Sequence, residues 1–206
     1  DFGFTDPKDG NALNRVKITT LPTTGTLKLN GSAVTAGDFI LASDIGAGKL
    51  AWTPALNANG PGLSAFTFQV EDDGGTSNGG VNLDQSANTI TFNVTAVNDP
   101  PTLVADTGTL ASGATLTANA ASGVLSNDSD VDGDSLTVSA ILEGTTGTPT
   151  AVSGGSPGVI NAAHGTLTMN ADGSYSFVAS PTGSNQTQVF TYTVSDGTTT
   201  QTQTLT

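Results

Sequence analysis

The chain contains an internal duplication: three short motifs occur in each half, in the same order. A repeated order of motifs marks repeated structural units, so the fold must be one that about 100 residues can complete. The matching segments are residues 9–13 and 132–136, 25–30 and 165–170, and 66–72 and 190–196. Two homologous domains in tandem are the simplest explanation.

Each half has the pattern of short strands joined by tight turns. Apolar residues alternate at Val16 and Ile18, and again along residues 89–97, as in strands with one buried face. Asn30-Gly31 and Asp172-Gly173 are two-residue turn signals between alternating runs, which predicts hairpins. The chain has 26 Gly and 9 Pro and no helix of normal length is evident. We expect an all-β fold in which each half is an antiparallel, Ig-like sandwich with Greek-key connections.

The two predicted domains differ at their ends. A long segment with strands expected near residues 103–105 and 115–118 leads into the second half, whereas five residues precede Asp6 in the first. We therefore expect residues 1–99 to form a repeat that lacks its opening strand, and residues 100–206 to form a second repeat that is truncated at its C-terminal strand. An open sheet edge of this kind is expected to pair with a neighbouring repeat.

Two further features connect the halves. Residues 98–101 read Asn-Asp-Pro-Pro, and a short rigid linker is expected because proline cannot donate to a ladder and holds the chain extended. Trp52 and Phe177 occupy matching positions, and both are expected in the cores of their domains.

The second half also carries a dense acidic run with four carboxylates at alternate positions, a glycine among them and no cation nearby. These carboxylates belong to Asp128, Asp130, Asp132 and Asp134. Like charges this close disfavour joint ionisation, and a hard divalent cation bound by oxygen ligands removes the repulsion. We interpret the run as a calcium loop. A solvated acidic surface is the simpler alternative for the other, scattered acids.

Other metal loops fit the run less well. Its opening matches that of an EF-hand, but position 12 of such a loop is Ser139 where a bidentate Glu belongs, and flanking helices are not predicted. Magnesium is less favoured because it demands strict octahedral geometry and retains its waters.

The charge distribution supports a cation taken from solution. The formal net charge is -13, all five Lys and Arg residues lie within the first 49 positions, and residues 101–206 contain eight acids and no Lys or Arg. Salt bridges within that half cannot neutralise it. Nucleic acid is not an expected partner because no basic patch would face phosphates. No apolar run is long enough for a membrane span, and the absence of cysteine excludes disulfides and thiolate sites.

Several motifs resemble bacterial cadherin-like and VCBS-type tandem repeats of large surface adhesins, including those of the RTX class. In the first half they are residues 1–7, 9–11, 52–54, 66–70, 72–76 and 97–101. In the second half they are residues 127–128, 130, 132–134, 165–168, 170, 172–175 and 192–196. The resemblance covers nearly the whole chain.

The resemblance implies a seven-stranded cadherin-like sandwich and a calcium-stiffened, extracellular spacer at a bacterial cell surface or in a secreted adhesin. Its partners would be neighbouring repeats, with homophilic, surface or glycan contacts elsewhere in the parent protein. In cadherins the junction calcium is bound by a linker Asn-Asp, by an Asp-x-Asp pair and by an Asp that closes a later strand. The residues at those positions here are Asn98, Asp99, Asp132, Asp134 with the adjacent Asp130, and Asp196, and in the first unit Asp9, Asn11 and Asp72.

With the residues of the two acidic loops included, the expected calcium ligands form one set. They are Asp6, Asp9, Asn11, Asp72, Asn98, Asp99, Asp128, Asp130, Asp132, Asp134 and Asp196. The cadherin glutamate of the opening strand and the acidic Asp-Arg-Glu segment have no clear equivalents in this sequence.

Enzymatic activity is not expected. His164 is the single histidine, and no Gly-x-Ser-x-Gly nucleophile elbow is present. Paired carboxylates can hydrolyse glycosides, but nothing else in the sequence marks a sugar cleft. Two alternatives to a spacer remain: a carbohydrate-binding β-sandwich module, which would need exposed aromatic platforms, and a surface-layer or filament subunit.

Overall fold

A computed structural model describes residues 2–7, 10–182 and 185–206 of the chain. The chain folds as two compact units, Asp1–Val97 and Asn98–Thr206, so the residues of the expected linker belong to the second unit. The expectations that the first repeat lacks an opening strand and that the second is truncated at its C-terminal strand stay predictions. Among the described residues, no helix is long and apolar enough to cross a membrane.

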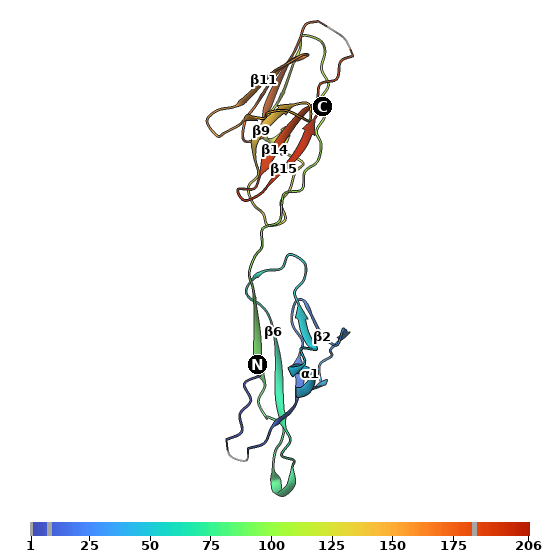
Figure 1. Cartoon of the computed structure of the whole chain (residues 1–206), viewed down its shortest axis with the longest axis vertical. Helices are drawn as coiled ribbons and strands as arrows, with labels where there is room; N and C mark the ends of the chain where they lie inside the picture. The colour runs from blue at the N-terminus through green and yellow to red at the C-terminus, as the bar shows by residue number, and fades with distance from the viewer. Residues whose placement is uncertain (1, 8–9, 183–184) are drawn as a thin grey trace. The chain divides into compact units, whose positions relative to one another are not determined.

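Unit 1 consists of two antiparallel sheets with the orders β4-β1-β6-β7 and β3-β2-β5 (Figure 1). The strands are β1 Leu13–Thr20, β2 Thr26–Leu29, β3 Ser32–Ala33, β4 Phe39–Leu41, β5 Leu50–Thr53, β6 Gly60–Asp72 and β7 Asn88–Val94. One short helix, α1 (Ala42–Gly46), and a 3-10 turn, η1 (Ser77–Gly79), complete the unit. Its core contains Val16, Ile18 and Leu27 with Phe66 and Phe68, because alternate residues of each strand face inward.

Unit 2 also has two antiparallel sheets, with the orders β10-β9-β14-β15 and β11-β12-β13-β8. The strands are β8 Thr115–Ala118, β9 Thr137–Glu143, β10 Thr150–Ala151, β11 Gly158–Ala162, β12 Gly165–Met169, β13 Tyr175–Ala179, β14 Phe190–Ser195 and β15 Thr200–Leu205, with a 3-10 turn η2 at Ala120–Ser122. Figure 1 shows β14 and β15 side by side in this unit. Tyr192, Leu167 and Val138 are among its most buried side chains.

The repeated motifs occupy equivalent strands in the two units. The motif at residues 25–30 includes β2 and that at 165–170 includes β12, while the motifs at 66–72 and 190–196 lie on β6 and β14. A Cβ on Gly25 would lie 2.7 Å from Trp52 Nε1, and one on Gly165 would lie 2.7 Å from Phe177 Cζ. Each glycine therefore makes room for the aromatic side chain of the next strand in its sheet. The predicted all-β fold, with two antiparallel sheets in each unit, is confirmed.

The local predictions mostly agree with the structure. Asn30 and Gly31 both have positive φ (52° and 84°) and join β2 to β3 in a two-residue turn, as predicted. Residues 170–173 form a β-turn as well, in which Gly173 N donates to Asn170 O at 3.1 Å, so the predicted hairpin of β12 and β13 is also present. Asp172 lies within this turn and accepts hydrogen bonds from the N–H and hydroxyl of Ser174. Residues 103–105 are not a regular strand; they lie between single bridges at Thr102 and Asp106.

Candidate metal centre

The acidic run forms a compact loop that leads into β9 of unit 2. Asp130 organises this loop, because its Oδ1 accepts the N–H of Asp132 at 2.8 Å and that of Asp134 at 3.5 Å. Gly133 has φ 80°, a left-handed conformation that a glycine adopts without strain. Carboxylate oxygens of Asp130, Asp132 and Asp134 lie within 4.8 Å of one another. The loop therefore brings three of the predicted ligands together, and it is followed by a strand as opposed to an EF-hand helix.

Two oxygens of the acidic run are buried and have no hydrogen-bond partner. They are Asp128 Oδ2 and Asp130 Oδ2, while the Oδ1 atom of each side chain is bonded to a backbone N–H. A buried carboxylate oxygen without a partner costs more than a neutral orphan, for which about 1–3 kcal/mol is usual. A hard cation with oxygen ligands satisfies such atoms, so the residues present fit calcium.

Asn98 and Asp99 are held to the same end of unit 2. The N–H of Asp99 donates to Asp132 Oδ2 at 2.7 Å, and the side-chain amide of Asn98 donates to Asp196 Oδ2 at 3.0 Å. The Thr199 hydroxyl, the Asn98 amide and the N–H groups of Thr199 and Thr198 hold the pKa of Asp196 far below its usual range. Asp196 is therefore a stable anion next to the linker residues.

One acidic residue of this region was missed in the sequence. Asp106 Oδ1 accepts the side-chain amide of Asn127 at 3.1 Å, and its Oδ2 accepts the buried Tyr192 hydroxyl at 2.7 Å. Burial raises the pKa of Asp106, against the opposing effect of those two bonds. Burial also raises the pKa of Asp128, which the Val104 N–H lowers and the charge of Asp106 raises further.

The signal for Asp106 was weak because its main partner, Tyr192, is 86 positions away in the sequence. Burial and the bond to Asp106 raise the pKa of Tyr192 far above its usual range, so this hydroxyl is a permanent donor. The acidic centre of unit 2 thus includes a carboxylate that comes from the segment before β8.

The corresponding region of unit 1 is less acidic. The side chains of Asn11 and Asp72 both lie next to the backbone of Gly74. A Cβ placed on this glycine would be 2.2 Å from Asn11 Nδ2 and 3.1 Å from Asp72 Oδ1. Asp6 Oδ2 accepts the Asn11 N–H at 3.2 Å. Asp73, which sequence reasoning did not select, accepts the Ala12 N–H at 2.8 Å. Asp9 lies outside the described residues.

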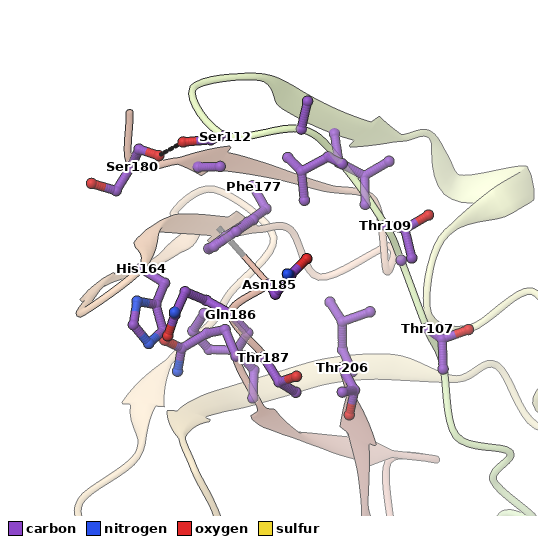
Figure 2. A pocket seen from close by; sticks show the side chains of 18 of the residues that line it. Thr107, Thr109, Ser112, His164, Phe177, Ser180, Asn185, Gln186, Thr187 and Thr206 are labelled. Atoms are coloured by element: carbon purple, nitrogen blue, oxygen red, sulfur yellow. Dashed lines mark hydrogen bonds between the residues drawn. The ribbon is translucent and has the colours of Figure 1, made fainter. Parts of the chain in front are cut away.

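Unit 2 also contains a cavity of about 450 Å³ that is lined by uncharged groups around the single histidine. Figure 2 shows His164, Phe177 and Asn185 around it, with a hydrogen bond from the Ser112 hydroxyl to the Ser180 carbonyl at its rim. The Phe177 ring packs edge-on against Phe190 at 5.7 Å between centroids. Among the lining residues no Ser, His and acidic group form a triad, and none is acidic.

Comparisons with known proteins give one structural neighbour and one family. No curated protein matches the sequence. A solved endo-fucoidan hydrolase of glycoside hydrolase family 107 is 19% identical over 96% of this chain and 23% of its own, with a TM-score of 0.28. The chain thus spans less than a quarter of that hydrolase, and a likeness this low carries no argument. The model of the bacterial cadherin-like domain family matches residues 98–206, more than half of the chain, and the chain therefore belongs to the bacterial cadherin-like family.

Proposed function

We propose that this chain is a pair of calcium-binding extender repeats from a large bacterial adhesin, either surface-attached or secreted, of the VCBS and RTX type. The observation that carries the proposal is the pair of buried, unpartnered oxygens on Asp128 and Asp130. Both belong to a loop whose neighbours Asp132 and Asp134 add further carboxylates.

The electrostatics of unit 2 support a cation from solution. The segment 101–206 has no Lys or Arg, so no side chain other than His164 can carry a compensating positive charge. Opposite charges close to a carboxylate favour its ionised form, and a bound divalent ion supplies that charge without a long side chain. The oxygen-only donor set favours calcium over zinc or copper, which prefer nitrogen and sulfur ligands.

The residues that would hold calcium fall into two groups. Asp128, Asp130, Asp132 and Asp134 offer carboxylates from the loop, and Asn98, Asp99 and Asp196 offer oxygens from the linker and from the end of β14. Calcium bound among them would fix Asn98 and Asp99 to unit 2 and restrict the chain that leaves Val97. In a tandem array this restriction would make a spacer stiffer, and that is the mechanical role we propose.

The test is calcium binding by the 206-residue chain, followed by thermal unfolding and small-angle scattering with calcium and with excess EDTA. Calcium should raise the melting temperature of unit 2 and increase the radius of gyration as the linker stiffens. An unchanged melting temperature in EDTA contradicts calcium binding. A raised melting temperature with unchanged scattering retains the metal site but contradicts the spacer role.

We further propose that the chain is not an enzyme, and that a carbohydrate-binding role is the second candidate. The cavity of Figure 2 favours this alternative, because the Phe177 ring and the amides of Asn185 and Gln186 are the kinds of group that contact neutral sugars. Binding of neutral oligosaccharides that is lost in Phe177→Ala would support it. Ordered lateral arrays in electron micrographs would instead favour a surface-layer or filament subunit.

A further inference from the structure

The outer face of the β4-β1-β6-β7 sheet of unit 1 carries cationic and apolar side chains beside one another. Alternate residues of β1 point into the core, which leaves Arg15 and Lys17 on the outer face. Arg15 pairs with Leu41 of β4, and Lys17 pairs with Phe39. Phe39 and Leu41 are 40% and 50% exposed. An exposed aromatic ring therefore lies next to two cations on this face.

The two cations have different environments. The Arg15 guanidinium stacks on the Phe39 ring, with 4.0 Å between Cζ and the ring centroid, and forms a salt bridge with Glu71 Oε1 at 2.9 Å. Its charge is therefore balanced and its position is fixed. Lys17 Nζ lies 5.9 Å from the centroid of the same ring, and the described part of the chain contains no salt bridge to it. Lys17 thus presents an uncompensated ammonium group beside a ring that Arg15 holds in place.

The same positions of unit 2 show that the sandwich does not require these groups. By the sheet orders, β9 and β10 of unit 2 match β1 and β4 of unit 1. Lys17 and Ala140 both lie opposite the fourth residue of the third repeated motif, so they are equivalent. Ala140 pairs with Ala151, as Lys17 pairs with Phe39. The two sheets form with alanine at both positions, so Lys17 and Phe39 are not needed for the fold.

The exposure of this face does not depend on what precedes residue 1. In unit 2 the segment before the acidic loop forms its backbone hydrogen bonds with Ser129, with the end of β15, and with β13 and Ser180. Within the described residues, β9 and β10 receive none of these bonds. A preceding segment placed in the same way on unit 1 would leave Lys17 and Phe39 exposed.

The chemistry of the face favours an anionic sugar. Because Glu71 already balances Arg15, Lys17 gives the face a net positive charge on a chain whose formal net charge is -13. Next to it on the same face, the hydroxyls of Thr19 and Thr67 lie 2.6 Å apart. An aromatic ring, an ammonium group and neutral hydroxyls match the C–H face, the carboxylate and the hydroxyls of an acidic sugar. An acidic peptide is less favoured, because the face of a sheet has no free backbone groups to pair with it.

We propose that the outer face of β1 and β4 binds an acidic polysaccharide, with a carboxylate-bearing sugar stacked on Phe39 and its carboxylate bound by Lys17. Arg15 is a positioning residue that holds the Phe39 ring. One such contact is weak because the face is exposed, and copies of the site on a multivalent polymer would act together. None of the acidic-loop residues and none of the residues around the cavity of Figure 2 contributes to this site. The inference is therefore independent of calcium binding and of neutral-sugar binding in the cavity.

The experiment titrates a short oligogalacturonate into the 206-residue chain and follows the backbone amide signals by NMR. Calcium is removed first, because it would bridge the carboxylates of the ligand to the acidic loop. The amides of Lys17 and Phe39 should shift, and those of Ala140 and Ala151 should not. Raising the ionic strength from about 0.05 M to about 0.5 M should weaken binding about threefold, since an exposed charge pair is screened.

Two variants and one control test the assignment. Lys17→Ala and Phe39→Ala introduce the residue that unit 2 has at the matching positions, so both should fold. Lys17→Ala should weaken binding about threefold to fivefold and remove most of the salt dependence. Phe39→Ala should weaken binding about fivefold or more, because the stacking surface is lost. Lys28→Ala removes the same charge from an exposed position on β2 of the other sheet and should leave binding unchanged.

Several outcomes would overturn the proposal. They include no amide shifts in excess ligand, shifts confined to unit 2, and an equal loss of affinity in Lys28→Ala. An oligogalacturonate with methyl-esterified carboxylates keeps the sugar rings and loses the charge, so binding as tight as that of the acid would exclude recognition of the carboxylate. Equal affinity for a polyglutamate peptide would exclude recognition of the sugar and would indicate an acidic protein partner.

Discussion

The substitution Asp130→Asn should change the stability of unit 2 in a direction that depends on calcium. An asparagine retains a carbonyl Oδ1 that can accept the N–H groups of Asp132 and Asp134. It replaces the buried, unpartnered Oδ2 with a neutral amide group that can donate. The change is thus nearly isosteric and removes one negative charge from a cluster of three carboxylates.

The expected magnitudes follow from mass action. Extracellular calcium modules bind with dissociation constants of about 10⁻⁴–10⁻³ M, so about 10 mM calcium stabilises the native state by about 1.4–2.7 kcal/mol. For a domain of about 100 residues this is a rise of roughly 5–20 °C in melting temperature. The variant should lose most of this rise. In EDTA it should be as stable as the parent chain or more stable, because repulsion within the loop is reduced.

The assay is thermal unfolding in calcium and in EDTA, with the two units followed separately. Both tyrosines lie in unit 2 and the single tryptophan lies in unit 1, so their spectra distinguish the two transitions. Glu143→Gln is the matched control, since it removes one charge from the same unit outside the acidic loop. A loss of stability from Asp130→Asn that is equal in both buffers would refute the reasoning.

Three further outcomes test other parts of the structure. Tyr192→Phe should destabilise unit 2 by about 1–3 kcal/mol in urea unfolding, because buried Asp106 loses its donor, and no loss would contradict that bond's role. Gly25→Ala should cost more than Gly31→Ala, by about 1–3 kcal/mol, since both have positive φ but only Gly25 is crowded by Trp52. The N–H of Ser86, with its hydroxyl and the Asn88 amide, lowers the pKa of Asp84 against some desolvation. Its contribution to stability should therefore be present near neutral pH and lost as the pH falls below about 4, a slope that Asp84→Asn should reduce in acid titration of unit 1.

Much of the fold could be predicted from the sequence because its signals are local or periodic. The alternation through Val16 and Ile18 fixes which face of β1 is buried, and Asn30-Gly31 fixes a hairpin, since both depend on neighbouring residues. The single bridges that replace a strand around residues 103–105 were not foreseen, because they depend on Ser129 and Leu205, which are distant in the sequence.

The candidate metal site likewise has a part that could be predicted from the sequence and a part that only the structure shows. Alternate aspartates in one short run had to lie close together, so Asp130, Asp132 and Asp134 could be grouped from the sequence alone. Which oxygens are buried without partners depended on chain segments that meet only after folding. The same holds for the bond from the Tyr192 hydroxyl to Asp106 and for the effect of the Asp106 charge on the pKa of Asp128. Local spacing is fixed by covalent geometry, whereas burial and long-range pairing depend on how the two sheets pack, and only the tertiary structure determines them.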